Sequence, residues 1–203
     1  MTDSRPRPDA TGYAEFWEWF RSNEERLYHF ESDQETVLGE LDKRLKRVHD
    51  DLCFEFSPLR DDGTREFVVS AGGIAESFPV VAAIVSAAPE LPRWRWVRLR
   101  PRRASFAGEI SVAGDRLHTD EVRFKLYRDG DKIGIALFID GFTEARREAL
   151  SHAAWILLDA ALGEFTTELE VGFVDLLEAE HRHAAGACPV EELPAAFDRA
   201  LAQ

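Results

Sequence analysis

The stretch from Lys132 to Phe142 limits the possible folds more than any other part of this 203-residue chain. Residues at odd and even positions are both apolar here, in the order Ile133, Gly134, Ile135, Ala136, Leu137, Phe138 and Ile139. An extended segment with two apolar faces is typical of a strand in the middle of a covered sheet. A second strand-like segment, Val122 to Tyr127, precedes it, and Asp129-Gly130 between them indicates a tight hairpin. We therefore expect a central strand with an antiparallel neighbour.

The rest of the chain alternates between helical and extended patterns without a regular order. Three- and four-residue apolar spacing predicts helices over residues 11–30, 33–50, 77–86, 144–162 and 191–202. Extended patterns predict strands over residues 52–56, 65–70, 93–99, 106–112 and 165–174. This order differs from the strict strand-helix alternation of a doubly wound sheet. It favours an α+β fold, with one mostly antiparallel sheet of about five to seven strands and helices packed on one face and at its ends.

The domain organisation follows from composition. Residues 1–10 are polar and carry Pro6 and Pro8, which predicts a flexible tail. With 45% hydrophobic residues, the remaining chain can bury a substantial core. Residues 11–203 show no internal repeat and no break in composition, so we expect a single α+β domain there.

The charge balance narrows the classes of partner. The 38 acidic residues exceed the 25 lysines and arginines, and the formal net charge is −13. Binding to nucleic acid requires a basic footprint, so this balance argues against a nucleic-acid partner. The first residues lack the apolar run of a signal peptide, and no stretch is long enough to span a bilayer. We therefore expect a cytoplasmic protein with no membrane partner, in which Cys53 and Cys188 stay free thiols.

One basic segment interrupts this acidic chain. Residues 93–103 contain six arginines and two tryptophans in eleven positions, with no acid among them. A strand here, ended by Pro101, would place the tryptophans in the core and carry its last arginines to a rim. Guanidinium groups bind carboxylates and phosphates through paired hydrogen bonds. The segment predicts a site for an anionic small molecule or an acidic protein partner, formed by Arg98, Arg100, Arg102 and Arg103. Alternatively, these arginines pair with the chain's own carboxylates.

Other polar residues support weaker hypotheses. Metal-ligand types cluster at Glu178, Glu180, His181, His183 and Cys188, but their spacing matches no zinc signature, so we expect no metal. The pair Gly72-Gly73 belongs to neither a phosphate-binding loop nor a dinucleotide fingerprint, so we expect no cofactor.

An enzymatic alternative uses acid and base side chains. His152, Asp159 or Asp140 would act as acid or base in a cleft beside the arginines. The competing interpretation is that His152 and Asp159 form the polar stripe of an otherwise buried helix. Common hydrolase and metalloprotease motifs are missing from the sequence, so enzymatic activity stays undecided at this point.

Several short motifs resemble those of a bacterial family of uncharacterised proteins, a domain of unknown function. The motifs are Phe16-Trp17-Glu18-Trp19-Phe20, then Ala87-Ala88-Pro89-Glu90-Leu91-Pro92 with Trp94, then Arg100-Pro101-Arg102, and finally Leu162-Gly163-Glu164. The resemblance implies a bacterial cytoplasmic protein with one α+β domain, and it brings no assigned activity. Our leading hypothesis is a non-catalytic binding or interaction domain that recognises an anionic ligand or acidic partner through the arginine-rich strand end. The acidic remainder would instead suit a basic partner.

Overall fold

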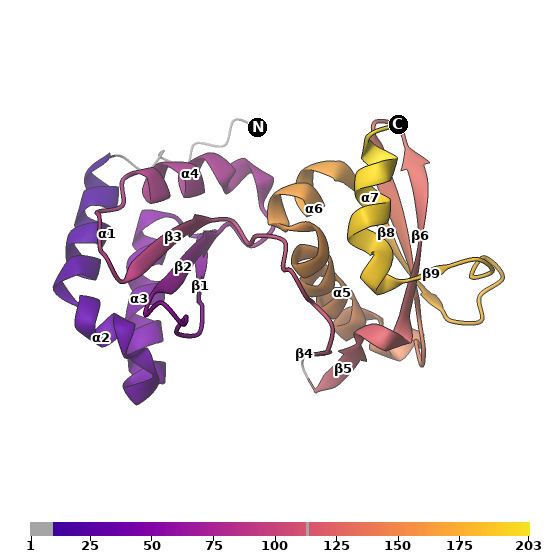
Figure 1. The fold of residues 1–203 in the computed structure, drawn as a ribbon, viewed down its shortest axis with the longest axis horizontal. Helices are drawn as coiled ribbons and strands as arrows, with labels where there is room; N and C mark the ends of the chain where they lie inside the picture. Colours follow the sequence, from indigo (N-terminus) through magenta and orange to yellow (C-terminus); the bar gives the residue numbers. More distant parts are fainter. Residues whose placement is uncertain (1–9, 113) are drawn as a thin grey trace. The chain divides into compact units, whose positions relative to one another are not determined.

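The chain folds into two compact units, Met1–Leu99 and Arg100–Gln203. The structure, a computed structural model, describes residues 10–112 and 114–203. Each unit combines helices with strands, so the α+β class is confirmed (Figure 1). The predicted tail lies outside the described residues except for Ala10. We describe each unit by itself, and the single-domain hypothesis stays a prediction.

The described residues of the first unit form four α-helices. They are α1 (Ala10–Ser22), α2 (Glu24–Tyr28), α3 (Gln34–Val48) and α4 (Phe78–Ser86). The prediction of a single helix over residues 11–30 is wrong, because the helix is interrupted at Asn23. The side-chain amide of Asn23 donates to the Trp19 carbonyl oxygen at 2.8 Å, which competes with continuation of the helix. A 3-10 turn (Phe30–Asp33) then leads into α3, as the second helical pattern predicted.

The sheet of the first unit has three strands in the order β1-β2-β3. They are β1 (Cys53–Phe56), β2 (Arg65–Ser70) and β3 (Trp94–Arg98). β1 and β2 form the antiparallel hairpin that the sequence predicted, whereas β3 runs parallel to β2 after the α4 crossover. The predicted alternation in β3 is confirmed, since Trp94 and Trp96 lie on one face with their rings stacked 5.9 Å apart.

The core of the first unit is rich in aromatic side chains. Phe67 on β2 is fully buried, and its ring contacts those of Phe16, Trp17 and Phe20 on α1. The Trp17 indole nitrogen donates to the Ile84 carbonyl oxygen at 2.8 Å, which ties α1 to α4. Helices therefore cover the β2 face that carries Phe67.

The second unit contains the strand from which the sequence interpretation began. A four-stranded sheet has the order β8-β7-β6-β9, so β7 is internal as predicted. Its strands are β6 (Val122–Asp129), β7 (Lys132–Ile139), β8 (Val171–Glu178) and β9 (Cys188–Pro189). A separate hairpin joins β4 (Glu109–Val112) to β5 (Asp115–His118). The helices are α5 (Arg147–Leu162), α6 (Glu164–Glu170) and α7 (Leu193–Leu201).

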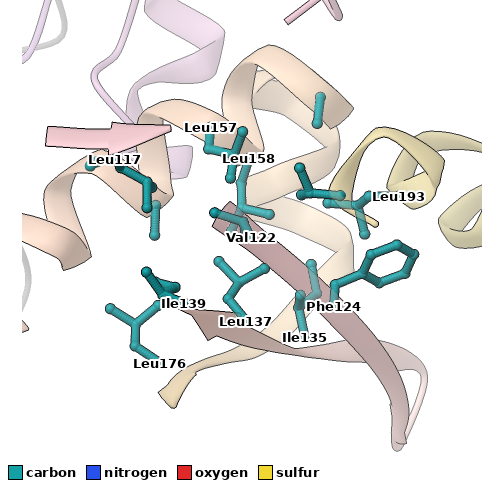
Figure 2. Packing of buried hydrophobic residues seen from close by; sticks show 14 of the residues in the cluster. Leu117, Val122, Phe124, Ile135, Leu137, Ile139, Leu157, Leu158, Leu176 and Leu193 are labelled. Atoms are coloured by element: carbon teal, nitrogen blue, oxygen red, sulfur yellow. The ribbon is translucent and has the colours of Figure 1, made fainter. Parts of the chain in front are cut away.

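Aliphatic side chains fill the core of the second unit (Figure 2). Leu137 on β7 and Leu157 on α5 are fully buried, and Leu193 on α7 belongs to the same cluster. The opposite face of β7 carries Ala136 and Phe138, which form a small cluster with Ala184. Both faces of β7 are thus buried, which explains its doubly apolar sequence.

Two expectations need correction. The described residues form three sheets of three, two and four strands, so a single sheet of five to seven strands is wrong. The strand predicted over residues 165–174 begins only at Val171, because α6 occupies the first part. Glu164 and Thr167, one helical turn apart, are both buried, and this docking outweighs the local strand propensity. No helix in the described ranges is long and apolar enough to cross a bilayer.

Candidate functional site

The four predicted site arginines fall in different surroundings. Arg98 ends β3 in the first unit, where it lies beside Val69 of β2. Its side chain is exposed, and no described residue forms a hydrogen bond or ion pair with it. Arg100, Arg102 and Arg103 belong to the second unit. Arg98 is therefore the one predicted site residue with its guanidinium available.

Arg100 is hydrogen-bonded to the junction between α5 and α6. Its backbone N–H donates to a carboxylate oxygen of Glu164 at 2.9 Å, and its carbonyl oxygen accepts the Glu164 N–H at 2.9 Å. The guanidinium lies 3.6 Å from Asp159 and 3.9 Å from the fully buried Glu164. These contacts support the alternative in which arginines pair with the chain's own acids.

Arg102 and Arg103 continue this attachment. Both terminal nitrogens of Arg102 donate to the Asp198 carboxylate on α7, at 2.8 and 2.9 Å. This pairing raises the pKa of Arg102 and lowers the pKa of Asp198. The backbone N–H of Arg103 donates to the Ala160 carbonyl oxygen at 2.8 Å, while its side chain is exposed. The segment after Arg98 thus serves mainly to anchor the chain to α5, α6 and α7.

Arg98 lies where two parallel strands end. Ligands of open α/β sheets bind beyond the carboxyl ends of the strands, which makes this edge a candidate site. The next residue, Leu99, has a φ of 57°, a strained value for a residue with a branched side chain. Its N–H donates to the Val69 carbonyl oxygen at 2.8 Å, so the strained turn is fixed against β2. The turn redirects the backbone immediately after Arg98.

The Gly72-Gly73 loop follows β2 at the same edge. Both glycines have positive φ values, 60° and 81°. The N–H of Gly72 donates to the Ser70 hydroxyl at 2.9 Å, so this donor already has a partner within the loop. Gly73 also has an interaction partner. Arg98, and not the loop backbone, is therefore the group at this edge that is suited to an anion.

A hydroxyl, a carboxylate and an imidazole meet near the start of β1. The Ser77 hydroxyl donates to Asp51 at 2.6 Å, and the His49 ring nitrogen lies 3.5 Å from the same carboxylate. In a catalytic triad the imidazole lies between the hydroxyl and the carboxylate, whereas here the carboxylate is central. Ser77 is also buried. The cluster joins the start of β1 to the start of α4 and lacks the order needed for nucleophilic catalysis.

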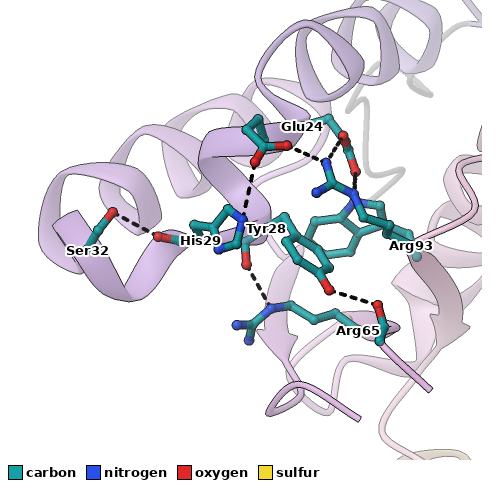
Figure 3. A network of polar contacts seen from close by, with 9 residues as sticks. Glu24, Tyr28, His29, Ser32, Arg65 and Arg93 are labelled. Carbon is teal, nitrogen blue, oxygen red and sulfur yellow. Dashed lines mark hydrogen bonds and ion pairs between the residues drawn. The ribbon is translucent and has the colours of Figure 1, made fainter. Parts of the chain in front are cut away.

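Arg93 and Arg65, which the sequence interpretation did not name as site residues, belong to a network of polar contacts (Figure 3). Arg93 donates through Nε to Glu24 at 3.0 Å and through Nη2 to Glu25 at 2.7 Å. Glu24 also accepts the Trp94 indole N–H at 2.9 Å, and the guanidinium lies 4.2 Å from the Tyr28 ring centroid. The two carboxylates raise the pKa of Arg93, and the guanidinium lowers the pKa of Glu25.

Arg65 is the buried member of this network, with 4% of its surface exposed. It donates to the carbonyl oxygens of Tyr28 and Ser57, each at 2.9 Å, and pairs with Glu31. The contacts with Tyr28 and Glu31 tie α2 and the following turn to β2, and the contact with Ser57 joins the end of β1 to β2. A basic residue two positions before the apolar run Phe67-Val68-Val69 was the signal for this role, because a strand end can bury the arginine stem.

The acid and base residues of the enzymatic alternative are not brought together. Asp140 follows β7, at the end of the unit where α5 begins. Asp159 lies near the other end of α5, twelve residues after Arg147, which corresponds to about 18 Å along a helix. His152 is exposed on α5, and Asp159 faces Arg100. These three side chains do not form one catalytic cluster.

The histidines after β8 stack on one another. The rings of His181 and His183 lie 5.1 Å apart, and His181 stacks 6.5 Å from Phe138. Within residues 10–112 and 114–203, no group of three or more His, Cys, Asp or Glu side chains is arranged to hold a metal ion. Cys188 is exposed in β9, and Cys53 lies in β1 with its sulfur 3.4 Å from the Ser70 hydroxyl.

Similarity to known proteins adds nothing to this geometry. Comparison of the chain with protein-family models, with curated proteins and with solved structures found no match. The resemblance to an uncharacterised bacterial family therefore stays a prediction, and any functional assignment must come from the chain's own residues.

Proposed function

We propose that this protein is a non-catalytic binding protein whose first unit holds an anionic group, a carboxylate or a phosphate, at Arg98. The observation that carries the proposal is the availability of this one guanidinium. Arg98 is exposed at the ends of two parallel strands, and no described residue forms an ion pair with it. A guanidinium in that position can offer two parallel hydrogen bonds to an incoming oxyanion.

The proposal assigns the anion to Arg98 alone among the four predicted arginines. To bind a ligand, Arg100 would have to leave Asp159 and Glu164, and Arg102 would have to leave Asp198. Breaking a paired charge costs free energy that the ligand would have to replace. Arg98 carries no such cost, which makes it the best-suited anchor.

Binding without catalysis is the interpretation that fits the surroundings of Arg98. The Ser77 hydroxyl near this edge is buried, and its hydrogen-bond partner is a carboxylate and not an imidazole. Neither His152 nor Asp159 belongs to this unit. The Ser77 cluster thus lacks the exposed nucleophile and adjacent imidazole base of a nucleophilic site.

The proposal is tested by thermal unfolding of the full chain with inorganic phosphate, citrate and a poly-glutamate peptide as separate probes. A ligand that binds only the folded state raises the unfolding temperature in a saturable way. We expect at least one probe to do so for the wild type and Arg95→Gln, and none for Arg98→Gln. Arg95 is a matched control, because it lies on the same strand, is exposed and pairs with Asp62.

The three probes separate the sources of the anion. A shift with phosphate or citrate would indicate a small molecule, whereas a shift with poly-glutamate alone would indicate an acidic protein partner. The proposal is wrong if no probe shifts the wild type, or if Arg98→Gln responds as Arg95→Gln does.

A further inference from the structure

A second surface, independent of Arg98, lies on the outer strand of the four-stranded sheet. β8 pairs with β7 along one side only, since it stands first in the strand order. No other strand within the described ranges pairs with its outer side. An unpaired edge presents a row of backbone N–H and C=O groups, which another extended chain can use.

The regular part of this strand is its second half, residues 174–178, which we name the β8 edge. A register shift occurs earlier, where Gly134 of β7 faces Gly172 and Phe173 together. Such bulges discourage pairing of neighbouring chains. From Val174 to Glu178 the pairing with β7 is continuous, so the outward backbone groups are evenly spaced there.

The length and exposure of β8 distinguish it from the other outer strands. β8 has eight residues, whereas β9, at the opposite side of the same sheet, has two. Asp175 and Glu178 are exposed, and the Phe173 ring, 37% exposed, lies next to Tyr127 on the sheet face away from the core. The β8 edge thus has open backbone groups, and the partly exposed Phe173 ring lies just before it, over Gly134 of β7.

Charge indicates which kind of chain would fit. Residues 148–181 contain no lysine or arginine but carry Asp175, Glu178 and Glu180 along and just beyond β8. Two arginines of other segments lie near β8: Arg123 donates to the Ala179 carbonyl oxygen at 3.0 Å, and Arg147 has a pKa that is raised mainly by its hydrogen bonds to Glu144 and in small part by Asp175. Arg147 is held by both oxygens of Glu144, at 2.6 and 2.7 Å. The acids of the β8 edge therefore favour a basic partner.

We propose that the β8 edge binds an extended basic segment of a partner protein, which adds to the sheet as a further strand. Backbone hydrogen bonds would supply affinity, a basic side chain would lie near Asp175, and an apolar side chain would contact Phe173. This surface does not depend on the anion site, and the two proposals fail separately.

The test uses the full chain and a synthetic peptide with the sequence Arg-Trp-Arg-Trp-Val-Arg-Leu, acetylated and amidated at its ends. This sequence is strand-forming and basic, as residues 93–99 of the chain show. At about 0.15 M salt, where weak long-range attraction is screened, we expect saturable binding. Hydrogen exchange should slow at the amides of the β8 edge and not at β6.

Two matched controls separate strand addition from simple charge attraction. The same peptide with a methyl group on every internal backbone nitrogen keeps every charge but loses its backbone donors on both edges, and we expect at least tenfold weaker binding. The variant Asp175→Lys with Glu178→Lys should also bind at least tenfold more weakly. Equal binding of the methylated peptide, or protection outside β8, would overturn the proposal.

The remaining outcome concerns a second copy of the chain. If the protein alone is a dimer by light scattering, with the β8 amides protected before peptide is added, the edge belongs to self-association and the proposed partner is wrong. A monomer whose β8 amides become protected only with the unmethylated peptide supports the proposal.

Discussion

The two units share one arrangement of strands but differ in the charged residue that lies at the end of its last strand. In each, an antiparallel hairpin is followed by a helical crossover and a strand parallel to the second hairpin strand. The first unit uses β1, β2, α4 and β3, and the second uses β6, β7, α5 with α6, and β8. Aligned on this pattern, Arg98 opposite Val69 corresponds to Glu178 opposite Ile139.

The comparison teaches that topology does not fix the charge at the strand end. The same arrangement carries a basic group in one unit and an acidic group in the other, and our two proposals accordingly assign them partners of opposite charge. The cores also differ, with stacked aromatic rings in the first and mostly aliphatic side chains in the second. Either filling can support this arrangement, because a core requires matched volume and apolarity more than a particular residue.

The largest expected effect comes from emptying each core in turn. Phe67→Ala should destabilise the first unit by about 3–5 kcal/mol, and Leu137→Ala the second by about 2–5 kcal/mol. Tryptophan fluorescence distinguishes them in urea, because four of the five tryptophans lie in the first unit and the fifth, Trp155 in the second, is already 43% exposed. Only Phe67→Ala should shift the fluorescence transition strongly if the units unfold separately.

The control for this pair is Leu59→Ala, a side chain that is 54% exposed and should change stability by less than about 0.5 kcal/mol. An equal shift of the fluorescence transition by Phe67→Ala and Leu137→Ala would show that the units unfold as one cooperative body. That result would support the single-domain prediction.

A medium effect on stability is expected at Gly163, where residues 100–102 of the basic segment lie against the junction of α5 and α6. Gly163 has a φ of 82°, and an added Cβ would lie 3.1 Å from the Arg102 backbone nitrogen. Gly163→Ala should therefore cost about 1–3 kcal/mol, measured by thermal or urea unfolding. Gly39→Ala in α3 is the matched control, because nothing lies within 4 Å of the added atom.

The two alanine substitutions should change the free energy of unfolding in opposite directions. Alanine stabilises a helix interior relative to glycine by about 0.5–1 kcal/mol, so Gly39→Ala should raise stability. If Gly163→Ala left the stability unchanged, the segment at Arg102 would not be packed against α6 as the structure shows.

The smallest effect concerns the ion pair between Arg102 and Asp198. Because the folded pKa of Asp198 is lowered below its usual 3.8, its contribution is present at higher pH and is lost as the pH falls through the folded pKa. Asp198→Asn should cost less than about 1 kcal/mol near neutral pH, because the pair is partly exposed.

Unfolding of the wild type and Asp198→Asn across pH measures this difference, which should shrink below the usual carboxyl pKa. The exposed Asp131→Asn is the control and should have no effect at any pH. A difference between wild type and Asp198→Asn that grows on acidification would contradict the assignment.

Local patterns predicted most of the elements. The doubly apolar β7, the Asp129-Gly130 turn, α3 and the alternation of Trp94 with Trp96 all agree with the structure. These features depend on neighbours one to four residues apart, which a sequence pattern records directly. The prediction of a strand where α6 lies was wrong, because burial of Glu164 and Thr167 against distant residues outweighs the local strand propensity.

The candidate site was less predictable. The basic segment at residues 93–103 was visible, but which arginines remain available depends on acids far away in sequence, such as Glu24 for Arg93 and Asp198 for Arg102. The strand arrangement that the two units share could not be predicted from the sequence either, since a topology can recur while the residue types differ.

The sequence by itself determined an acidic α+β protein with one basic segment and a strand buried on both faces. Only the tertiary structure decided that the chain forms two units, that their sheets are separate, and that Arg98 differs from the arginines around it. The physical reason is that hydrophobic periodicity acts over a few residues, whereas the pairing of charges depends on which distant carboxylates the fold brings within hydrogen-bonding distance.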